Sequence, residues 1–190
     1  ANTGQEIEIL KDLNCEIHAF EPHPIIFKIL KEKYNDYKNV IFNEAAVWSS
    51  NEYKDLYFKN SKVSVNGGAT LIVHNDNISK NIKTKVKCID ISEYIKNLNL
   101  QIDLFWMNIE GAEYDIINHL LNTGTINRIN YIYFEDHERR FKIIKRFFSY
   151  LYGQFYILKR FMIFKKLKKL GFEINIHSND HYIVSRKALI

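Results

Sequence analysis

The stretch IDLFWMNIEGAE, residues 102–113, decides the fold class of this 190-residue chain. Its first part, 102–109, is dominated by large apolar residues, as expected for a strand buried inside a sheet. Gly111 permits a tight turn, and the run 113–121 has the spacing of an amphipathic helix. A buried strand that passes directly into a helix is the repeating unit of α/β sheets, so we predict that class.

The same alternation continues on both sides of this stretch. Strands are predicted at 16–20, 39–42 and 130–135, and helices at 5–13, 25–34 and 91–98. Residues 52–90 interrupt the alternation with short β-like runs, and 171–177 with 180–187 predict an antiparallel hairpin. We therefore expect a single α/β domain over 1–190, with a doubly wound, mostly parallel sheet and a C-terminal antiparallel hairpin.

Composition favours a globular protein of a reducing compartment. Apolar residues make up 46% of the chain and aromatic residues 14%. Cys15 and Cys88 match no metal-ligand spacing, so no metal site is predicted, and we interpret both as buried thiols, with a disulfide as the alternative. No signal peptide is visible. The longest uncharged apolar run in the C-terminal part has 12 residues, whereas a membrane-spanning helix needs about 20. The predicted location is cytoplasmic, with peripheral membrane contact as an open addition.

Residues 139–172 form a basic, aromatic segment that we expect to be helical. The segment contains eleven Lys or Arg, ten aromatic residues and no Asp or Glu, whereas the remainder carries 16 basic and 22 acidic residues. The favoured interpretation is a pair of amphipathic helices that cover the sheet and extend their charged ends into solvent. A peripheral membrane or lipid-linked glycan surface is the second interpretation, and nucleic-acid binding is the least favoured.

The opening residues ANTGQ, 1–5, predict the turn between a strand and a helix. Small residues and Gly4 let a backbone approach a ligand closely, and the next helix offers free N–H groups and a positive dipole end. Glu21 follows the predicted strand 16–20, seventeen residues after Gly4. A carboxylate there can accept hydrogen bonds from both hydroxyls of a ribose. An ordinary turn and a solvated glutamate are the alternatives.

Asn108 and Glu110 stand at the carboxyl end of the strand at 102–109, the edge where ligands bind in open α/β sheets. We therefore interpret them as residues of an active site. Glu113 is a further candidate for substrate binding. Its alternative is an acid in the first turn of a helix, where the dipole stabilises a negative charge.

Glu135 and His137 follow the next predicted strand in the same way. A histidine at this edge could take a proton from an attacking hydroxyl. Glu135 could orient that histidine or contact the substrate. A structural histidine with satisfied hydrogen bonds is the alternative.

The motifs together resemble the FkbM-type methyltransferases, which are S-adenosylmethionine-dependent enzymes with a class I, Rossmann-like fold. The order and spacing agree over residues 1–138. The segments that carry the resemblance are ANTGQ, FEPHP (20–24), NEAAVW (43–48), IDLFWMNIEGAE and FEDH (134–137). The predicted hairpin also agrees with the class I topology.

The resemblance implies a cofactor and a set of residues around it. Ala1, Asn2 and Gly4 would surround the methionine part of S-adenosylmethionine, and Glu21 would bind the ribose. The turn that contains Asn43, Ala45 and Ala46 would line the adenine pocket. Asn108 and Glu110 would face the methyl group and the acceptor.

The chain departs from the family pattern at two positions of the IEG motif. The family usually has a lysine two residues before an aspartate, whereas this chain has Trp106 and Asn108. The change removes one candidate carboxylate near the cofactor. It leaves open an alternative in which the chain is a non-catalytic, cofactor-binding partner module of a larger glycan-modifying or nucleic-acid-modifying protein.

The predicted function is O-methyl transfer to a hydroxyl of a sugar, a glycan or a small metabolite. Such a reaction aligns three atoms in line and benefits from a base that accepts the hydroxyl proton. His137 is our first candidate for the base and Glu110 the second, with Glu135 as the orienting residue. The family motif begins earlier, with an acidic residue and another glycine on the first central strand, so we expect the sequence to lack that strand and to be a piece of a longer protein.

Overall fold

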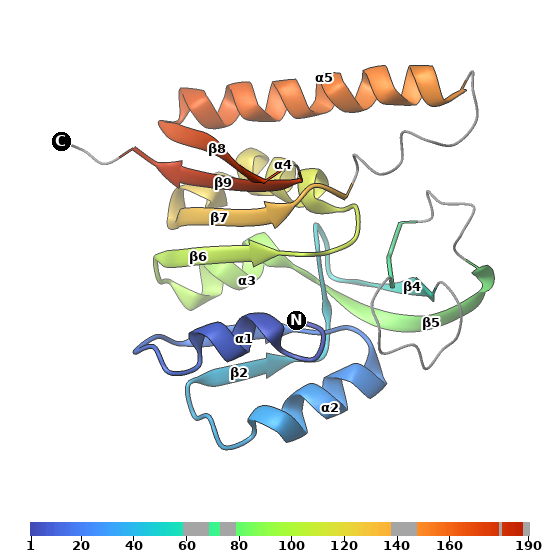
Figure 1. Ribbon diagram of the computed structural model, residues 1–190, viewed down its shortest axis with the longest axis vertical. Helices are drawn as coiled ribbons and strands as arrows, with labels where there is room; N and C mark the ends of the chain where they lie inside the picture. Colours follow the sequence, from blue (N-terminus) through green and yellow to red (C-terminus); the bar gives the residue numbers. More distant parts are fainter. Residues whose placement is uncertain (59–68, 73–78, 138–147, 179, 188–190) are drawn as a thin grey trace. The chain divides into compact units, whose positions relative to one another are not determined.

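The computed structural model describes residues 1–58, 69–72, 79–137, 148–178 and 180–187 (Figure 1). The chain divides into two compact units, Ala1–Asp90 and Ile91–Ile190. Helices and strands alternate over residues 5–43 and 91–178, which confirms the predicted α/β class. A single doubly wound, mostly parallel sheet stays a prediction. That the two units act as one domain stays a prediction.

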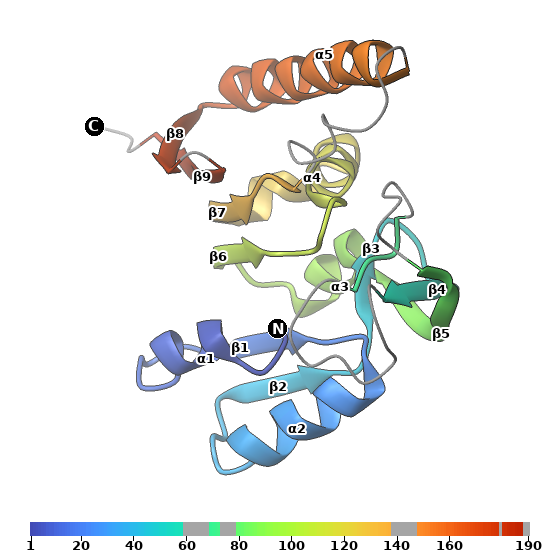
Figure 2. The ribbon, with the colours of Figure 1, turned by 45° about the vertical axis from the view of Figure 1, so that its right-hand side comes forward.

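Unit 1 contains two small sheets. Its elements are α1 (Gln5–Leu10), β1 (Ile17–Phe20), α2 (Pro24–Tyr34), β2 (Val40–Asn43), β3 (Ala46–Trp48), β4 (Glu52–Phe58) and β5 (Ser79–Asp90). β1 and β2 pair in parallel, and α2 is the crossover between them. β5 pairs in parallel with β3 and antiparallel with β4, in a sheet of its own that accounts for the strand-rich stretch at 52–90 (Figure 2).

Helix α2 begins where two prolines end the preceding strand. Pro24 is its first residue, where the missing N–H costs nothing, and the Nδ1 atom of His23 accepts the N–H of Ile25 at 3.2 Å, which caps the helix. Leu30 and Tyr34 lie one helical turn apart and are buried. They pack with residues of α1, β1 and β2 in the core of unit 1, which comprises Ile7, Ala19, Leu30, Tyr34 and Val40.

Gly4 is fixed by its neighbour Tyr34. Its φ of +86° lies in the left-handed region, and an added Cβ would lie 2.2 Å from Cε2 of Tyr34. The Tyr34 hydroxyl lies 2.8 Å from both the Gly4 carbonyl oxygen and Oε2 of Glu8. Internal packing alone therefore requires a glycine here, and its predicted contact with a cofactor stays a prediction.

Unit 2 contains a four-stranded mixed sheet with the order β6-β7-β9-β8. Its elements are α3 (Ile91–Leu98), β6 (Ile102–Met107), α4 (Glu113–Asn122), a 3₁₀ turn (Thr125–Arg128), β7 (Ile129–Glu135), α5 (Phe148–Lys169), β8 (Phe172–Ser178) and β9 (His181–Arg186). β6 and β7 are parallel, whereas β9 pairs antiparallel with both β7 and β8. The predicted C-terminal hairpin is therefore present, and its second strand lies beside β7.

Helices α4 and α5 pack on one face of this sheet through aromatic rings. Tyr114 of α4 meets Phe134 of β7 with ring centroids 5.6 Å apart, and Phe164 of α5 meets Tyr182 of β9 at 5.5 Å. Phe134 and Tyr182 stack on each other at 5.2 Å. These contacts place α5 against the hairpin and α4.

The basic segment forms a single helix over its described part. The helix α5 occupies 148–169, while 139–147 of the predicted helical pair lies outside the described residues. None of the helices in the described part of the chain combines the length and the apolar character that crossing a membrane requires.

We predict that Gly4→Ala destabilises the protein more than Gly124→Ala does. Both glycines have positive φ, at +86° and +72°, but an added Cβ at Gly124 would meet nothing within 4 Å. Gly124→Ala should therefore lower the free energy of unfolding by about 1–2 kcal/mol, and Gly4→Ala by about 2–4 kcal/mol because the overlap with Tyr34 adds to the backbone strain. Urea unfolding measures both free energies. Equal decreases would show that the Tyr34 ring moves aside without an energetic cost.

Candidate functional site

The first group of candidate residues lies at the carboxyl end of β1 in unit 1. Glu21 directly follows this strand and is only 7% exposed. Its Oε2 atom accepts the backbone N–H of Asn2 at 2.7 Å, and its Oε1 atom accepts the backbone N–H of His23 at 2.9 Å. The nitrogen of Ala1 donates to the Phe20 carbonyl oxygen at 2.7 Å. One buried carboxylate thus joins the opening turn to the entry of α2.

Two buried acceptors lie in the opening turn and in the first turn of α1. The Oδ1 atom of Asn2 and the Oε2 atom of Glu6 are, in the described part of the chain, the buried side-chain oxygens without a hydrogen-bond partner. Asn2 has a φ of +49°, so its backbone is held in the left-handed region. Buried polar atoms are normally paired, so the turn is suited to a ligand that carries hydrogen-bond donors.

The predicted adenine-side residues follow β2, next to Glu21. Asn43 ends β2, and its carbonyl oxygen accepts the N–H of Glu21 at 3.1 Å and that of Ala45 at 2.9 Å. Ala45 and Ala46 are buried, and Ala46 begins β3 opposite Cys88 of β5. The structure therefore brings Asn43 beside Glu21 through the backbone, while contact of Ala45 and Ala46 with an adenine ring stays a prediction.

The second group lies at the turn between β6 and α4 in unit 2. Glu110 and Gly111 both have positive φ, at +56° and +112°. The fully buried carboxylate of Glu113 accepts the N–H of Ile109 at 3.2 Å and that of Gly111 at 3.1 Å. A glutamate in the left-handed region is strained by about 1–2 kcal/mol, and such strain gathers at functional sites. Asn108 is exposed immediately after β6.

His137 joins this turn to the end of β7. Its Nδ1 atom lies 2.8 Å from Oε1 of Glu113. Its Nε2 atom lies 3.7 Å from Oε1 of Glu110 and 3.6 Å from Oε2 of Glu135. The imidazole is 3% exposed, so three carboxylates surround a buried ring. No trio of His, Cys, Asp or Glu within the described ranges is arranged to hold a metal ion.

These positions refine the sequence interpretation of unit 2. Glu113 holds Nδ1 of His137, the orienting contact that the sequence assigned to Glu135. The carboxylate of Glu113 is fully buried and is bonded to the backbone of the turn. Its predicted contact with a substrate stays a prediction. Glu110 and Glu135 are partly exposed and flank the other ring nitrogen.

The charge balance around His137 favours its protonated form. Burial lowers the pKa of His137, but the hydrogen bond to Glu113 and the charges of Glu113, Glu110 and Glu135 outweigh burial and raise the pKa above its ordinary value. A pKa raised by folding stabilises the folded state fully below the unfolded-state pKa of histidine. This contribution is lost as the pH rises through the raised value.

Sequence reasoning missed Asp136, which lies between Glu135 and His137. The side chain of Asp136 is fully buried, and its Oδ2 atom accepts hydrogen bonds from the hydroxyls of Tyr114 and Tyr156. Burial, followed by the charge of Asp136, raises the pKa of Tyr114, so this hydroxyl stays a donor. The Nη1 atom of Arg160 lies 3.9 Å from the same oxygen. Asp136 therefore anchors α5 beside His137.

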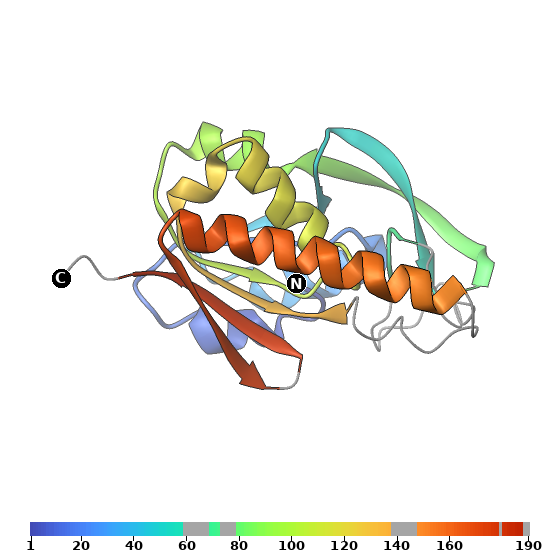
Figure 3. The same ribbon diagram turned by 90° about the horizontal axis from the view of Figure 1, so that it is seen from above.

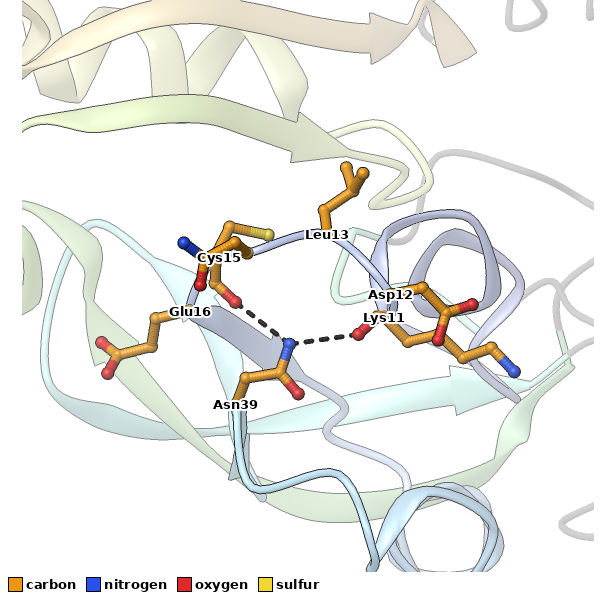
Figure 4. Close-up of a pocket in the computed structure, with 7 residues that line it drawn as sticks. Lys11, Asp12, Leu13, Cys15, Glu16 and Asn39 are labelled. Carbon is orange, nitrogen blue, oxygen red and sulfur yellow. Dashed lines mark hydrogen bonds between the residues drawn. The ribbon is translucent and has the colours of Figure 1, made fainter.

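A surface hollow of about 570 Å³ lies at the start of β1 (Figure 4). It is lined by Lys11, Asp12, Leu13, Asn14, Cys15, Glu16 and Asn39. The Asn39 side chain donates to the carbonyl oxygens of Lys11 and Cys15 at 3.2 and 3.1 Å. This end of β1 is opposite to the carboxyl end, where parallel α/β sheets bind ligands, so the hollow is separate from the candidate site.

Each unit pairs two parallel strands, β1 with β2 in unit 1 and β6 with β7 in unit 2. Polar residues follow the carboxyl ends of these strands, where ligands bind in α/β proteins. The family model described as the methyltransferase FkbM domain matches residues 1–174. The chain therefore belongs to the FkbM methyltransferase family, as the sequence motifs predicted. The comparisons with curated proteins and with solved structures gave no match.

We predict that the pKa of His137 lies above that of a free histidine and falls in Glu113→Gln, because the variant removes the charge that holds Nδ1. Titration of the imidazole signals by nuclear magnetic resonance measures this directly. Asp115→Asn is the control, because Asp115 lies on the same helix but pairs with Lys159 at 2.8 Å. An unchanged His137 titration in Glu113→Gln would contradict the assigned contact.

Proposed function

We propose that the chain is an S-adenosylmethionine-dependent O-methyltransferase that acts on a hydroxyl of a sugar or a small metabolite. The observation that carries the proposal is the orientation of His137, whose Nδ1 atom is held by Glu113 while its Nε2 atom faces the two partly exposed carboxylates of Glu110 and Glu135. Membership of a methyltransferase family supports the reaction class.

The opening turn fits the cofactor chemically. S-adenosylmethionine carries an ammonium group, two ribose hydroxyls and an adenine amino group, all of which donate hydrogen bonds. Asn2 and Glu6 offer buried oxygens without partners. Glu21 accepts two backbone N–H groups, but a carboxylate has about four acceptor positions, so it retains capacity for the ribose. When bound, the cofactor would supply an electrophilic methyl group.

His137 would act as the base toward the acceptor hydroxyl. In the neutral ring, the Nδ1–H donates to Glu113, so Nε2 carries the free lone pair. Nε2 would accept the hydroxyl proton as the methyl–oxygen bond forms. The imidazolium that results is stabilised by the surrounding carboxylates. Glu110 and Glu135 could accept hydrogen bonds from neighbouring hydroxyls of a sugar, which favours a polyhydroxylated acceptor.

A non-catalytic cofactor-binding role is the second candidate. It is favoured by Asn108, which is exposed at the end of β6 and stands where the family pattern has an aspartate. A neutral amide there cannot act as a base. Detection of a methylated product by mass spectrometry separates the two candidates, because the second requires binding without turnover.

We predict that Glu21→Ala weakens S-adenosylmethionine binding by roughly 10–100-fold, as expected for the loss of hydrogen bonds to a charged group. Isothermal titration calorimetry measures the affinity, and Glu21→Gln, which keeps one acceptor oxygen, should lose less. Glu16→Ala is the control, because Glu16 is exposed and pairs with His18 at 2.7 Å. Undiminished binding by a folded Glu21→Ala protein would exclude Glu21 from the cofactor site.

We predict that His137→Gln lowers kcat by roughly 10²–10⁴-fold and leaves S-adenosylmethionine affinity unchanged, because the base acts on the acceptor. Mass spectrometry of candidate sugars follows the addition of one CH₂ group. The activity of the native protein should rise with pH through the raised pKa of His137, since the base must be neutral. His177→Gln, at an exposed position of the hairpin, is the control. Full activity of His137→Gln would disprove the assignment.

A further inference from the structure

Over residues 154–169, whose side chains the structure describes, helix α5 packs within unit 2 through one of its sides. Tyr156, Ile163 and Leu167 are buried and follow one another at seven and four residues, so they share a face. Tyr156 and Arg160 on that side reach Asp136, and Arg160 also donates to the Tyr182 hydroxyl at 3.2 Å. This side therefore packs and anchors the helix within unit 2, where α5 lies along α4 and the hairpin (Figure 3).

The outward side of α5 consists of two zones along the helix axis. The first zone, 155–162, exposes five large apolar side chains, of which Phe155 and Phe161 are 67% and 63% exposed. The other three are Ile157, Leu158 and Met162. The second zone, 165–169, exposes four lysines, Lys165, Lys166, Lys168 and Lys169. At 1.5 Å per residue the centres of the zones are about 13 Å apart.

Ordinary surface chemistry does not account for both zones. Lysines in the last turn complement the helix dipole, which explains part of the second zone. Single exposed apolar residues are common, but contiguous patches mark interaction sites. No Asp or Glu occurs anywhere in 139–172, so every charged side chain that α5 itself contributes attracts negative charge and stands next to large apolar groups.

We propose that the outward side of α5 binds the surface of an anionic phospholipid membrane. In this arrangement the apolar zone enters the boundary between headgroups and acyl chains, and the lysine zone contacts the phosphates. Peripheral helices of this kind lie in the plane of the membrane surface with one apolar face inserted about 5–10 Å, so exposed apolar side chains on one side of α5 are sufficient for binding. The inference does not depend on the proposed methyl transfer.

The test is sedimentation of the protein with vesicles at physiological salt. Vesicles of equimolar phosphatidylcholine and phosphatidylserine should bind the native protein, and pure phosphatidylcholine vesicles should bind it much less. Lys165→Gln/Lys168→Gln/Lys169→Gln should weaken the binding by about a hundredfold, since each lysine near an anionic surface contributes roughly fivefold. Lys166 is left unchanged because it donates to Oδ1 of Asn118 at 3.3 Å.

The matched control Lys31→Gln/Lys85→Gln/Lys87→Gln removes the same charge from exposed positions of unit 1 and should bind almost as the native protein does. Leu158→Gln/Phe161→Gln should also abolish binding, whereas Leu100→Gln/Tyr53→Gln, at other exposed apolar positions, should not. Circular dichroism confirms that each variant is folded.

Three outcomes would overturn the proposal. The first is absence of binding by the folded native protein, or equal binding to neutral vesicles. The second is equal loss in the α5 and control lysine variants, which would mean attraction by net charge alone. The third is evidence of another occupant on this side of α5. A native dimer in sedimentation velocity that Leu158→Gln/Phe161→Gln dissociates would show a second copy of the chain there, and RNA binding that requires only the lysines would show a nucleic acid.

Discussion

The contact between Glu113 and His137 is the constraint on which the candidate site of unit 2 depends. A buried carboxylate is costly unless it is paired and hydrogen-bonded, and Glu113 is fully buried. It satisfies its oxygens with the N–H groups of Ile109 and Gly111 and with the ring of His137. The left-handed conformation of Glu110 is retained because this network fixes the turn. The contact between Glu113 and His137 therefore joins the IEGAE and FEDH motifs into a single hydrogen-bonded network.

Unit 1 uses the same device at the end of its first strand. Glu21 is nearly buried, and its two oxygens accept the backbone N–H groups of Asn2 and His23. In each unit, a buried carboxylate organises the turn that follows a parallel strand. Glu21 directly follows β1, and Glu113 is the first residue of α4, after the turn that follows β6. The two turns differ in the hydrogen-bonding capacity that remains for a ligand. Glu113 has a histidine as its third partner, whereas the turn held by Glu21 and the first turn of α1 each contain a buried acceptor without a partner.

Apolar periodicity was sufficient to locate most elements from the sequence. The runs at 16–20, 39–42, 102–109 and 130–135 correspond to β1, β2, β6 and β7, and the C-terminal hairpin is also present. β3 was not predicted, because three residues are too few to show a period and the strand is defined by pairing with distant β5.

The polar contacts of the site were less accessible to sequence reasoning. Strand-end position drew attention to Glu110 and His137, which the structure brings together with Glu113, but the partner of each ring nitrogen depends on geometry that no spacing encodes. Asp136 illustrates the limit, because its partners Tyr114 and Tyr156 lie 22 and 20 residues away on two different helices. Pro24 is itself a local signal of a helix start, and the helix predicted over 25–34 begins one residue earlier in the structure because of it.

Asp136 connects helix α5 to the chain segment that carries His137. It is the residue between Glu135 and His137, and it accepts the hydroxyl of Tyr156 from α5. Helix α5 therefore cannot shift along its axis without breaking a buried hydrogen bond to a charged group, which costs more than a neutral one, or moving the backbone that carries His137. If a membrane binds the outward side of α5, a displacement of the helix would therefore be transmitted through Tyr156 and Asp136 to the backbone that carries His137.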